Sequence, residues 1–360
     1  MKIFIVITPG LEDLAFKEIQ EKCPINNYEV IKGGILAEVD HQWIFNAHYL
    51  LKIPTRLLLR ITEFKVRDFP KLASKLSTLR WNDFLAHPEP QFQITTSKSR
   101  LMHTGRIEEV FRDILSKQLT KQPLSLDWQK KNYSPQTFYI RVVDDLLTLS
   151  VDLSGEALYK RGEGLIKGEA PLRENFASAL LYELLEGTTE EVLLFDPMCG
   201  SGTFLYEAQT FYSPSKRNFA FTENPLFKGK HFTIPKINNK LPIRTVLGHE
   251  INRELVEKLK RDYIRTCDSL NEEYPLSQPL VIICNPPYGE RIKIQGKRGS
   301  FLKEALAHFF TLDPLKLGWL VPTDMEEIFK APKNYRLKNK RRFRNGGLPV
   351  SFLSWERITQ

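Results

Sequence analysis

Apolar and polar positions alternate in short segments along the whole chain, and their spacing switches between that of strands and that of helices. In the first 160 residues we expect strands at residues 2–8, 29–39, 55–64, 92–97, 137–143 and 146–153. Helical spacing of apolar residues predicts helices at 11–19, 70–79 and 105–119. Strands and helices that are mixed in this way predict an α+β module.

The pattern changes beyond residues 159–164, where a basic, glycine-containing segment predicts a domain boundary. Further along, we expect strands at residues 192–195, 245–248, 280–284, 317–321, 335–343 and 349–356. Helices are expected between them, at residues 172–185, 203–210, 253–263 and 301–310. Short apolar strands that alternate with helices are typical of a parallel sheet covered on both faces. The second part is therefore predicted to be an α/β domain.

Composition excludes several classes of protein. The chain has 360 residues, of which 42% are hydrophobic and 26% charged, so it can bury a core and is neither disordered nor a disulfide-built mini-protein. No apolar run approaches the roughly 20 residues that cross a bilayer, and the N-terminal apolar run is too short for a signal peptide. We expect a cytoplasmic protein without a membrane segment. Its four cysteines form no Cys-x-x-Cys pair, so we expect neither a metal site nor a disulfide framework.

The formal charge of +9 is concentrated at the C-terminal end. Residues 330–360 contain nine Lys and Arg but only one Glu. Within this region Lys340, Arg341 and Arg342 lie on a predicted strand that could contact the phosphates of a nucleic acid. The alternative is a solvated edge strand whose cations discourage aggregation.

The first segment that suggests chemistry is Asp196-Pro197-Met198-Cys199-Gly200-Ser201-Gly202-Thr203, which joins a predicted strand to a helix. Glycines at the carboxyl end of such a strand let a nucleotide approach the backbone. A phosphate-binding loop would need Lys before Ser or Thr, and a dinucleotide site would need a third glycine, so both are excluded. The preceding acid suits a cation instead, such as the amino group or sulfonium of S-adenosylmethionine. A plain glycine turn before a helix is the alternative.

The second segment, Asn285-Pro286-Pro287-Tyr288, follows the predicted strand at 280–284 and ends at the same sheet edge as Gly200. The carboxamide oxygen of Asn285 and the carbonyl of Pro286 can both accept hydrogen bonds from one exocyclic amino group, while Tyr288 stacks on the base. Two acceptors favour localisation of the amine's lone pair, which can then attack an aligned methyl group. The segment therefore predicts methyl transfer to nitrogen, with a simple strand-ending turn as the alternative.

Together with Glu169-Ala170-Pro171-Leu172-Arg173-Glu174-Asn175, these segments resemble the THUMP-domain class I RNA methyltransferases, especially the bacterial large-subunit rRNA guanine-N2 type. The resemblance extends nearly end to end, through Thr8-Pro9-Gly10-Leu11-Glu12, Ser97 to Thr104 and Val151 to Glu156. It implies a ferredoxin-like subdomain at residues 1–54, a THUMP-like RNA-binding domain at 55–160 and a Rossmann-like methyltransferase domain at 161–360.

The resemblance also implies roles for individual residues. Cofactor-binding roles fall to Asp196, Pro197, Gly200, Ser201, Gly202, Glu250, Pro171 and Leu172. Glu250 would bind the ribose hydroxyls of S-adenosylmethionine, although an ordinary acid at a helix start explains it equally well. Catalytic roles fall to Asn285, Pro286, Pro287 and Tyr288. Further RNA contacts are expected at Lys98, Arg100, His103, Lys160 and Arg161.

The chain departs from the family between Glu250 and Asn285, which are only 35 residues apart. The family usually places a helix, a third strand and another helix there, so the third strand is expected to be absent or reduced. Asp268 is the candidate for contact with adenine. The predicted function is methylation of a guanine N2 amino group in RNA, with 23S rRNA expected and tRNA less favoured. A catalytically degenerate RNA-binding protein and an adenine-N6 methyltransferase are the alternatives.

Overall fold

The computed structural model describes residues 1–124, 135–161, 172–273, 276, 279–287 and 298–358. The chain forms two compact units. The first unit contains Met1–Thr8, Ile19–Arg161 and Ser215–Pro235, and the second contains Pro9–Glu18, Gly162–Pro214 and Lys236–Gln360. Helix α1 (Glu12–Lys22) contributes to both. The division into three domains at residues 54 and 160 stays a proposal.

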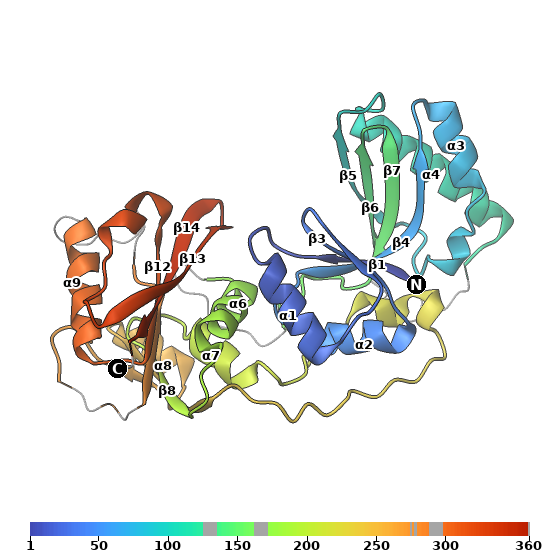
Figure 1. Ribbon diagram of the computed structural model, residues 1–360. Coiled ribbons are helices and arrows are strands. Elements are labelled where there is room, and N and C mark those ends of the chain that lie inside the picture. The colour runs from blue at the N-terminus through green and yellow to red at the C-terminus, as the bar shows by residue number, and fades with distance from the viewer. Residues whose placement is uncertain (125–134, 162–171, 274–275, 277–278, 288–297, 359–360) are drawn as a thin grey trace. The chain divides into compact units, whose positions relative to one another are not determined.

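The first unit is built on a seven-stranded sheet in the order β2-β3-β1-β4-β7-β6-β5 (Figure 1). Its strands are β1 (Lys2–Val6), β2 (Tyr28–Ile31), β3 (Gly34–Glu38), β4 (Arg56–Lys65), β5 (Gln91–Ser97), β6 (Thr137–Val143) and β7 (Leu146–Asp152). Neighbours are antiparallel except for β5 and β6, which are parallel. Because β4 pairs with both β1 and β7, one sheet contains strands from both sides of the domain boundary predicted between residues 54 and 55.

Helices α2 (His41–Leu50), α3 (Phe69–Ser77) and α4 (Thr104–Lys121) complete this α+β unit. Trp81 is fully buried beneath α3 and α4, and its ring lies against those of Phe111 and Phe138. The single strand expected at 29–39 is wrong: it is a hairpin, because Gly33 turns the chain with φ +85°.

Residues 215–235 pack in the first unit, although they follow the first strand and helix of the second domain in sequence. Two short 3-10 helices, Ala220–Glu223 and Pro225–Phe227, place Phe221 against the rings of Phe45 and His48. Burial lowers the pKa of His48 to about 3, so this histidine is an uncharged part of the core. The aromatic side chains explain why this irregular segment is held in place.

The second unit contains a seven-stranded sheet in the order β10-β9-β8-β11-β12-β14-β13. Its strands are β8 (Val192–Asp196), β9 (Ile243–Glu250), β10 (Ile264–Thr266), β11 (Leu280–Cys284), β12 (Lys316–Pro322), β13 (Tyr335–Asn345) and β14 (Leu348–Arg357). The neighbouring strands β10, β9, β8, β11 and β12 are parallel, whereas β14 and β13 are added as antiparallel strands. The helices are α6 (Glu174–Leu185), α7 (Thr203–Thr210), α8 (Arg253–Leu259) and α9 (Arg298–Thr311).

Helices cover both faces of this sheet, as expected. Trp319 of β12 packs on Phe309 of α9, whereas a Cβ added to the neighbouring Gly318 would lie 3.1 Å from Leu184 of α6. Successive residues of a strand point to opposite faces, so α9 and α6 lie on opposite sides of the sheet (Figure 1). These contacts confirm a Rossmann-like domain.

The sheet is reduced at one edge. Strand β10 has three residues and pairs only with Gly248, His249 and Glu250 at the end of β9. The third strand is thus present but short, which agrees with one of the two outcomes expected for this region. None of the helices in the described ranges is long and apolar enough to cross a membrane.

Candidate active site

The glycine turn begins where β8 ends. Asp196 is the last residue of β8 and is 2% exposed, and Gly202 forms the N-cap of α7. Gly200 and Gly202 have φ of +53° and +74°, in the left-handed region that favours glycine. A Cβ at Gly202 would lie 2.6 Å from the Ile264 side chain, whereas at Gly200 it would meet nothing within 4 Å. The turn is therefore packed closely on one side and open on the other.

Glu250 holds this turn to the next strand. Its carboxylate accepts hydrogen bonds from the Gly200 amide at 3.0 Å and from the Asn252 amide at 2.8 Å. The Cys199 amide donates to the His249 carbonyl at 2.9 Å. These bonds connect the end of β8 with the end of β9, so Glu250 lies beside the glycines that the sequence placed with it.

The two acids at the turn have no cation of the described chain paired with them. No Lys or Arg in the described part of the chain forms an ion pair with Asp196 or Glu250, and the Met198 amide is a long 3.3 Å from Asp196. Burial raises the pKa of Asp196 to about 8; the Met198 amide opposes this and the nearby charge of Glu250 adds to it. A positively charged ligand would favour the ionised form of Asp196.

The second predicted segment lies at the same sheet edge. Strand β11 is parallel to β8 and adjacent to it, with Ile282 opposite Phe195. Both strands end within three residues of this pair, so Asn285 and the glycine turn follow neighbouring strands at one edge. The Oδ1 atom of Asn285 is buried and has no hydrogen-bond partner among the described residues. It is an acceptor available to a ligand.

The remaining predicted site residues differ in how far they can be placed. Pro286 is buried and Pro287 half-buried beside Asn285, and Ser201 is buried with its hydroxyl 3.3 Å from that of Thr203. Leu172 is 5% exposed, two residues before α6. Pro171 and Tyr288 lie outside the described residues.

One buried histidine next to this site was not singled out from the sequence. His249 is 1% exposed, and its Nδ1 lies 2.9 Å from the hydroxyl of Ser269. Burial lowers the pKa of His249 to about 4. Ser269 belongs to a turn in which the carboxylate of Asp268, the candidate for contact with adenine, accepts from the Leu270 amide and the Asn271 side chain. The position of His249 directly before Glu250 was the signal in the sequence that could have identified it.

The basic strand β13 is matched by acids of its own unit. Arg341 is only 16% exposed and donates to Glu183 at 2.7 Å and to Asp13 at 2.8 Å. Burial by itself would lower the pKa of Arg341. Hydrogen bonds to these two carboxylates outweigh burial, so the pKa is raised above its usual value. The pKa of Glu326 is lowered to about 2, chiefly by hydrogen bonds from Arg342 and further by those from Lys340 and Ser351. These contacts give the strand a structural role, and RNA binding by Lys340, Arg341 and Arg342 stays a prediction.

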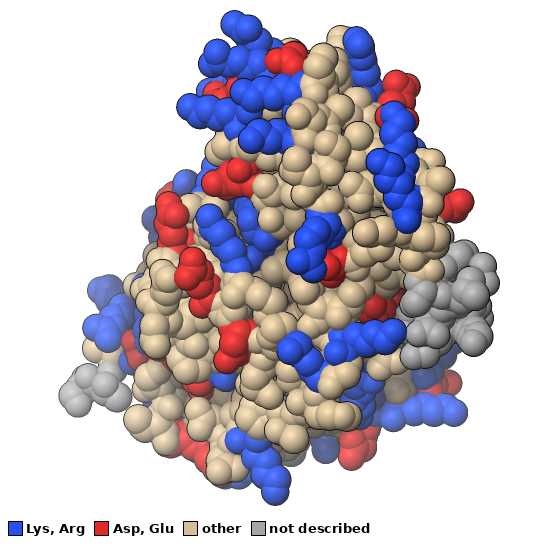
Figure 2. All heavy atoms as spheres, turned by 90° about the vertical axis from the view of Figure 1, so that its right-hand side faces the viewer, with Lys and Arg blue, Asp and Glu red and all other residues tan. Residues whose placement is uncertain are grey.

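The other predicted RNA contacts belong to the first unit. Lys98, Arg100 and His103 are exposed between β5 and α4. The carboxylate of Asp145, in the β6–β7 turn, accepts from the Arg100 amide and the Arg67 side chain, both at 2.8 Å. Figure 2 shows Lys and Arg side chains gathering at one end of the viewed face.

Two further predicted contacts lie where the first unit ends. Lys160 is exposed and pairs with Glu156, whereas Arg161 is 7% exposed and donates to the Lys52 carbonyl at 2.9 Å. The residues that the sequence predicts to contact RNA therefore lie in separate parts of the fold. No group of three or more potential metal ligands occurs among the residues that the structure describes.

Comparison with known proteins agrees with this geometry. Residues 161–323 match the family model described as RMKL-like, methyltransferase domain. The chain is 25% identical over 97% of its length to the putative RNA methyltransferase YpsC of Bacillus subtilis (strain 168), of which it covers 94%. It is also 26% identical, over 79% of its length, to the ribosomal RNA large subunit methyltransferase K/L of Buchnera aphidicola subsp. Schizaphis graminum (strain Sg). The chain covers only 44% of that relative.

Solved structures share the fold along the whole chain. The putative methyltransferase SMU.472, crystallised in complex with SAH, has a TM-score of 0.77 at 23% identity and covers 100% of this chain, with 98% of its own length matched. A possible methylase from Clostridium difficile 630 has a TM-score of 0.74 at 25% identity, with coverage of 100% and 98%. The segment that matches this methyltransferase-domain model, residues 161–323, carries both the glycine turn and Asn285.

Proposed function

We propose that the chain is an S-adenosylmethionine-dependent methyltransferase that acts on the exocyclic N2 amino group of a guanine in RNA, with 23S rRNA as the substrate. The methyltransferase domain supplies the reaction class. The names of the Bacillus subtilis and Buchnera relatives support RNA, and rRNA of the large subunit in particular.

The observation that carries the proposal is the buried Oδ1 of Asn285, which has no hydrogen-bond partner within the described ranges and lies at the edge shared with the glycine turn. A buried acceptor without a partner is costly, so its retention suggests a ligand that donates to it. An exocyclic amino group has two N–H bonds, and the Asn285 Oδ1 and the Pro286 carbonyl offer two acceptors. Accepting both bonds would hold the amine in place and make its lone pair available.

The residues at the turn fit the proposed cofactor. The sulfonium of S-adenosylmethionine would supply the methyl group, and it carries a positive charge. Asp196 and Glu250 offer the carboxylates for that charge and for the ribose, and the space beside Gly200 is open. Asp196 would thus discriminate between the cofactor and its demethylated product, which lacks the sulfonium charge.

The test combines product analysis with one substitution. The protein is incubated with labelled S-adenosylmethionine and, separately, with unmodified 23S rRNA and tRNA; the RNA is then digested and the labelled nucleoside identified. We expect N2-methylguanosine from 23S rRNA. N6-methyladenosine as the product would contradict the guanine assignment, and RNA binding without any calorimetric binding of the cofactor would contradict the enzyme itself.

Replacing Asn285 separates catalysis from cofactor binding. We expect Asn285→Ala to lower turnover by roughly 10²–10³-fold, because a preorganised acceptor is lost at the reacting amine. Cofactor affinity should stay close to that of the wild type, whereas Asp196→Ala should weaken it. Asn334→Ala, at an exposed position, is the matched control. Turnover by Asn285→Ala equal to that of the wild type would remove the proposed amine acceptor.

A further inference from the structure

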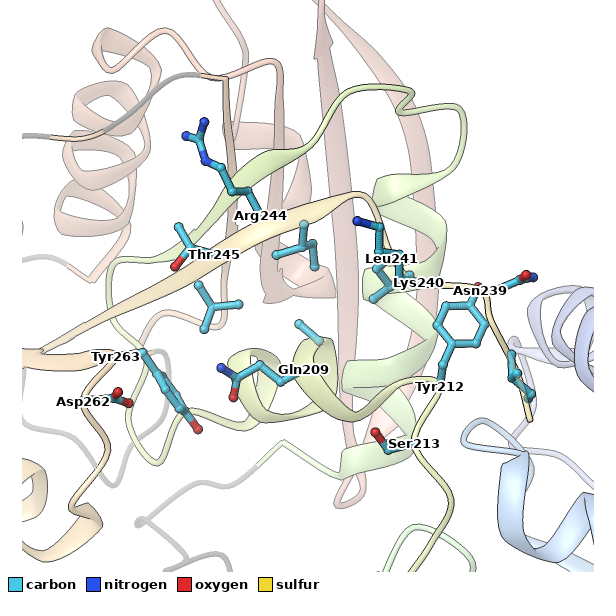
Figure 3. A pocket seen from close by; sticks show the side chains of 14 residues that line it. Gln209, Tyr212, Ser213, Asn239, Lys240, Leu241, Arg244, Thr245, Asp262 and Tyr263 are labelled. Atoms are coloured by element: carbon cyan, nitrogen blue, oxygen red, sulfur yellow. The ribbon is translucent and has the colours of Figure 1, made fainter. Parts of the chain in front are cut away.

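A pocket of about 540 Å³ lies in the second unit, apart from the glycine turn (Figure 3). Its walls come from the end of α7, from the amino-terminal half of β9 and from the segments before β9 and β10. This volume is within the range of about 300–1,000 Å³ that is usual for small-molecule sites. The pocket can therefore hold one unit of a larger ligand.

The short third strand explains why this pocket is open. Strand β10 pairs with Gly248 to Glu250 only, so within the described residues no strand covers the outer edge of β9 from Ile243 to Leu247. Arg244 and Thr245 on this stretch are exposed and line the pocket. The shortening that the sequence revealed between Glu250 and Asn285 thus leaves a concave surface in place of a longer strand.

The pocket is distinct from the proposed cofactor site. Glu250 ends β9 at the carboxyl edge of the sheet, whereas Arg244 lies near the amino end of the same strand. Six residues of extended chain separate them, which corresponds to about 20 Å. A ligand at the Arg244 end of the pocket would therefore lie away from the glycine turn, whereas Tyr263 at the other end directly precedes Ile264, whose side chain lies beside Gly202.

The side chains around the pocket are those that bind nucleotides. Figure 3 shows Tyr263 at one end and Tyr212 at the other, with the amide of Gln209 between them and Thr245 on the strand above. Aromatic rings stack on bases of any sequence, and amides and hydroxyls bond to base edges. Arg261 donates to the Tyr263 hydroxyl and so fixes that ring before a ligand arrives.

The charge beside the pocket is positive around Lys240 and Arg244, whereas the exposed Asp262 lies at the Tyr263 end. Lys236, Lys240 and Arg244 are exposed within nine residues, and no Asp or Glu occurs between Glu223 and Glu250. Lys240 pairs with Glu191, but both side chains are about half exposed or more, so solvent screens this pair and a phosphate can replace the carboxylate. The segment is complementary to a nucleic-acid backbone.

We propose that this pocket binds an unpaired nucleotide of the RNA substrate, with its base stacked on Tyr212 or Tyr263 and its phosphate beside Lys240 and Arg244. The inference rests on the proposed RNA methyltransferase function and adds a second contact that lies away from the target base. Such a contact would anchor the single-stranded RNA while the target guanine reaches Asn285.

The experiment measures stacking directly in the full-length protein. The probe is a short oligouridylate with one 2-aminopurine, whose fluorescence falls when the base stacks on an aromatic ring. We expect quenching by the wild type and by the variant Tyr212→Phe with Tyr263→Phe. The variant Tyr212→Leu with Tyr263→Leu should lose the quenching and bind roughly tenfold more weakly or worse. Tyr28→Leu, an exposed tyrosine on β2, is the matched control and should behave as the wild type.

The contribution of charge is tested separately. The variant Lys240→Ala with Arg244→Ala should bind the probe more weakly and with a flatter salt dependence. Lys303→Ala with Lys333→Ala, which removes two exposed cations elsewhere in the second unit, is the control. If the double Tyr→Leu variant does not fold, Tyr212→Leu alone takes its place, because Tyr212 is only half-buried.

The outcomes distinguish this inference from the proposed function. Quenching that persists in the Leu variant, or a wild type that methylates RNA but never quenches the probe, would overturn the inference and leave the methyltransferase proposal intact. The open edge of β9 would then remain as a surface for an added protein strand. Failure of the wild type to bind S-adenosylmethionine would overturn the proposed function whatever the pocket binds.

Discussion

Replacement of Asp196 by Asn should make the protein more stable and at the same time less able to bind its proposed cofactor. Asp196 is 2% exposed, and within the described ranges it accepts only the long hydrogen bond from the Met198 amide and pairs with no cation. Its pKa is raised from 3.8 to about 8, chiefly by burial. Asn has nearly the same shape and cannot ionise.

The size of the effect follows from proton linkage. Between about pH 4 and pH 8 the folded protein keeps a proton on Asp196 that the unfolded chain has released, so the free energy of unfolding falls as the pH rises. One pH unit corresponds to about 1.4 kcal/mol, which sets an upper limit of about 6 kcal/mol for this window. Relaxation and water entry reduce that limit, and we expect Asp196→Asn to add about 1–3 kcal/mol at pH 8.

Thermal unfolding at several pH values measures this effect. A gain of 1–3 kcal/mol should raise the melting temperature of the second unit by roughly 2–4 °C per kcal/mol at pH 8. The gain should shrink toward pH 4, where both side chains are uncharged. The exposed Asp324→Asn is the control and should show no such trend. A variant that is no more stable than the wild type at pH 8, or a gain that does not change with pH, would refute the reasoning.

Two more predictions follow from contacts around the site. His249→Leu removes the hydrogen bond to Ser269 beside the glycine turn. KM for S-adenosylmethionine should therefore rise roughly tenfold with little change in kcat. His249→Gln should restore part of the lost affinity. An unchanged KM in steady-state assays would show that this bond is only structural. Arg341→Met leaves Glu183, which is 4% exposed, without its cation and should cost about 3 kcal/mol in denaturant unfolding, unlike the exposed Arg344→Met. Loss of RNA affinity by Arg341→Met at undiminished stability would instead favour the RNA-contact prediction.

Elements of the second domain could be predicted closely because their signals are local. The expected strand at 280–284 and helix at 203–210 agree with the structure residue for residue. Apolar strands and glycine turns depend on their own side chains and backbone conformations, so a short window of sequence specifies them. Gly200 and Gly202 are such a case, since their positive φ angles require glycine wherever the turn lies.

Other elements could not be found in this way. Helix α2 was not expected: it begins at the Asp40 cap, whose carboxylate accepts from the Trp43 amide. Residues 215–235 show no strong periodicity and are ordered by aromatic contacts with distant residues such as Phe45. Elements stabilised by long-range packing carry little local signal.

The sequence by itself determined the two chemistry-bearing turns and the strands that precede them, because glycine, proline and apolar runs act on the backbone within a few residues. Only the tertiary structure decided what those turns meet. The pairing of β8 with β11 placed Asn285 next to the glycine turn, where its buried Oδ1 has no partner among the residues that the structure describes. Contacts between distant segments also matched Arg341 with Glu183 and Asp13, since ion pairs depend on distance in space and not on order along the chain.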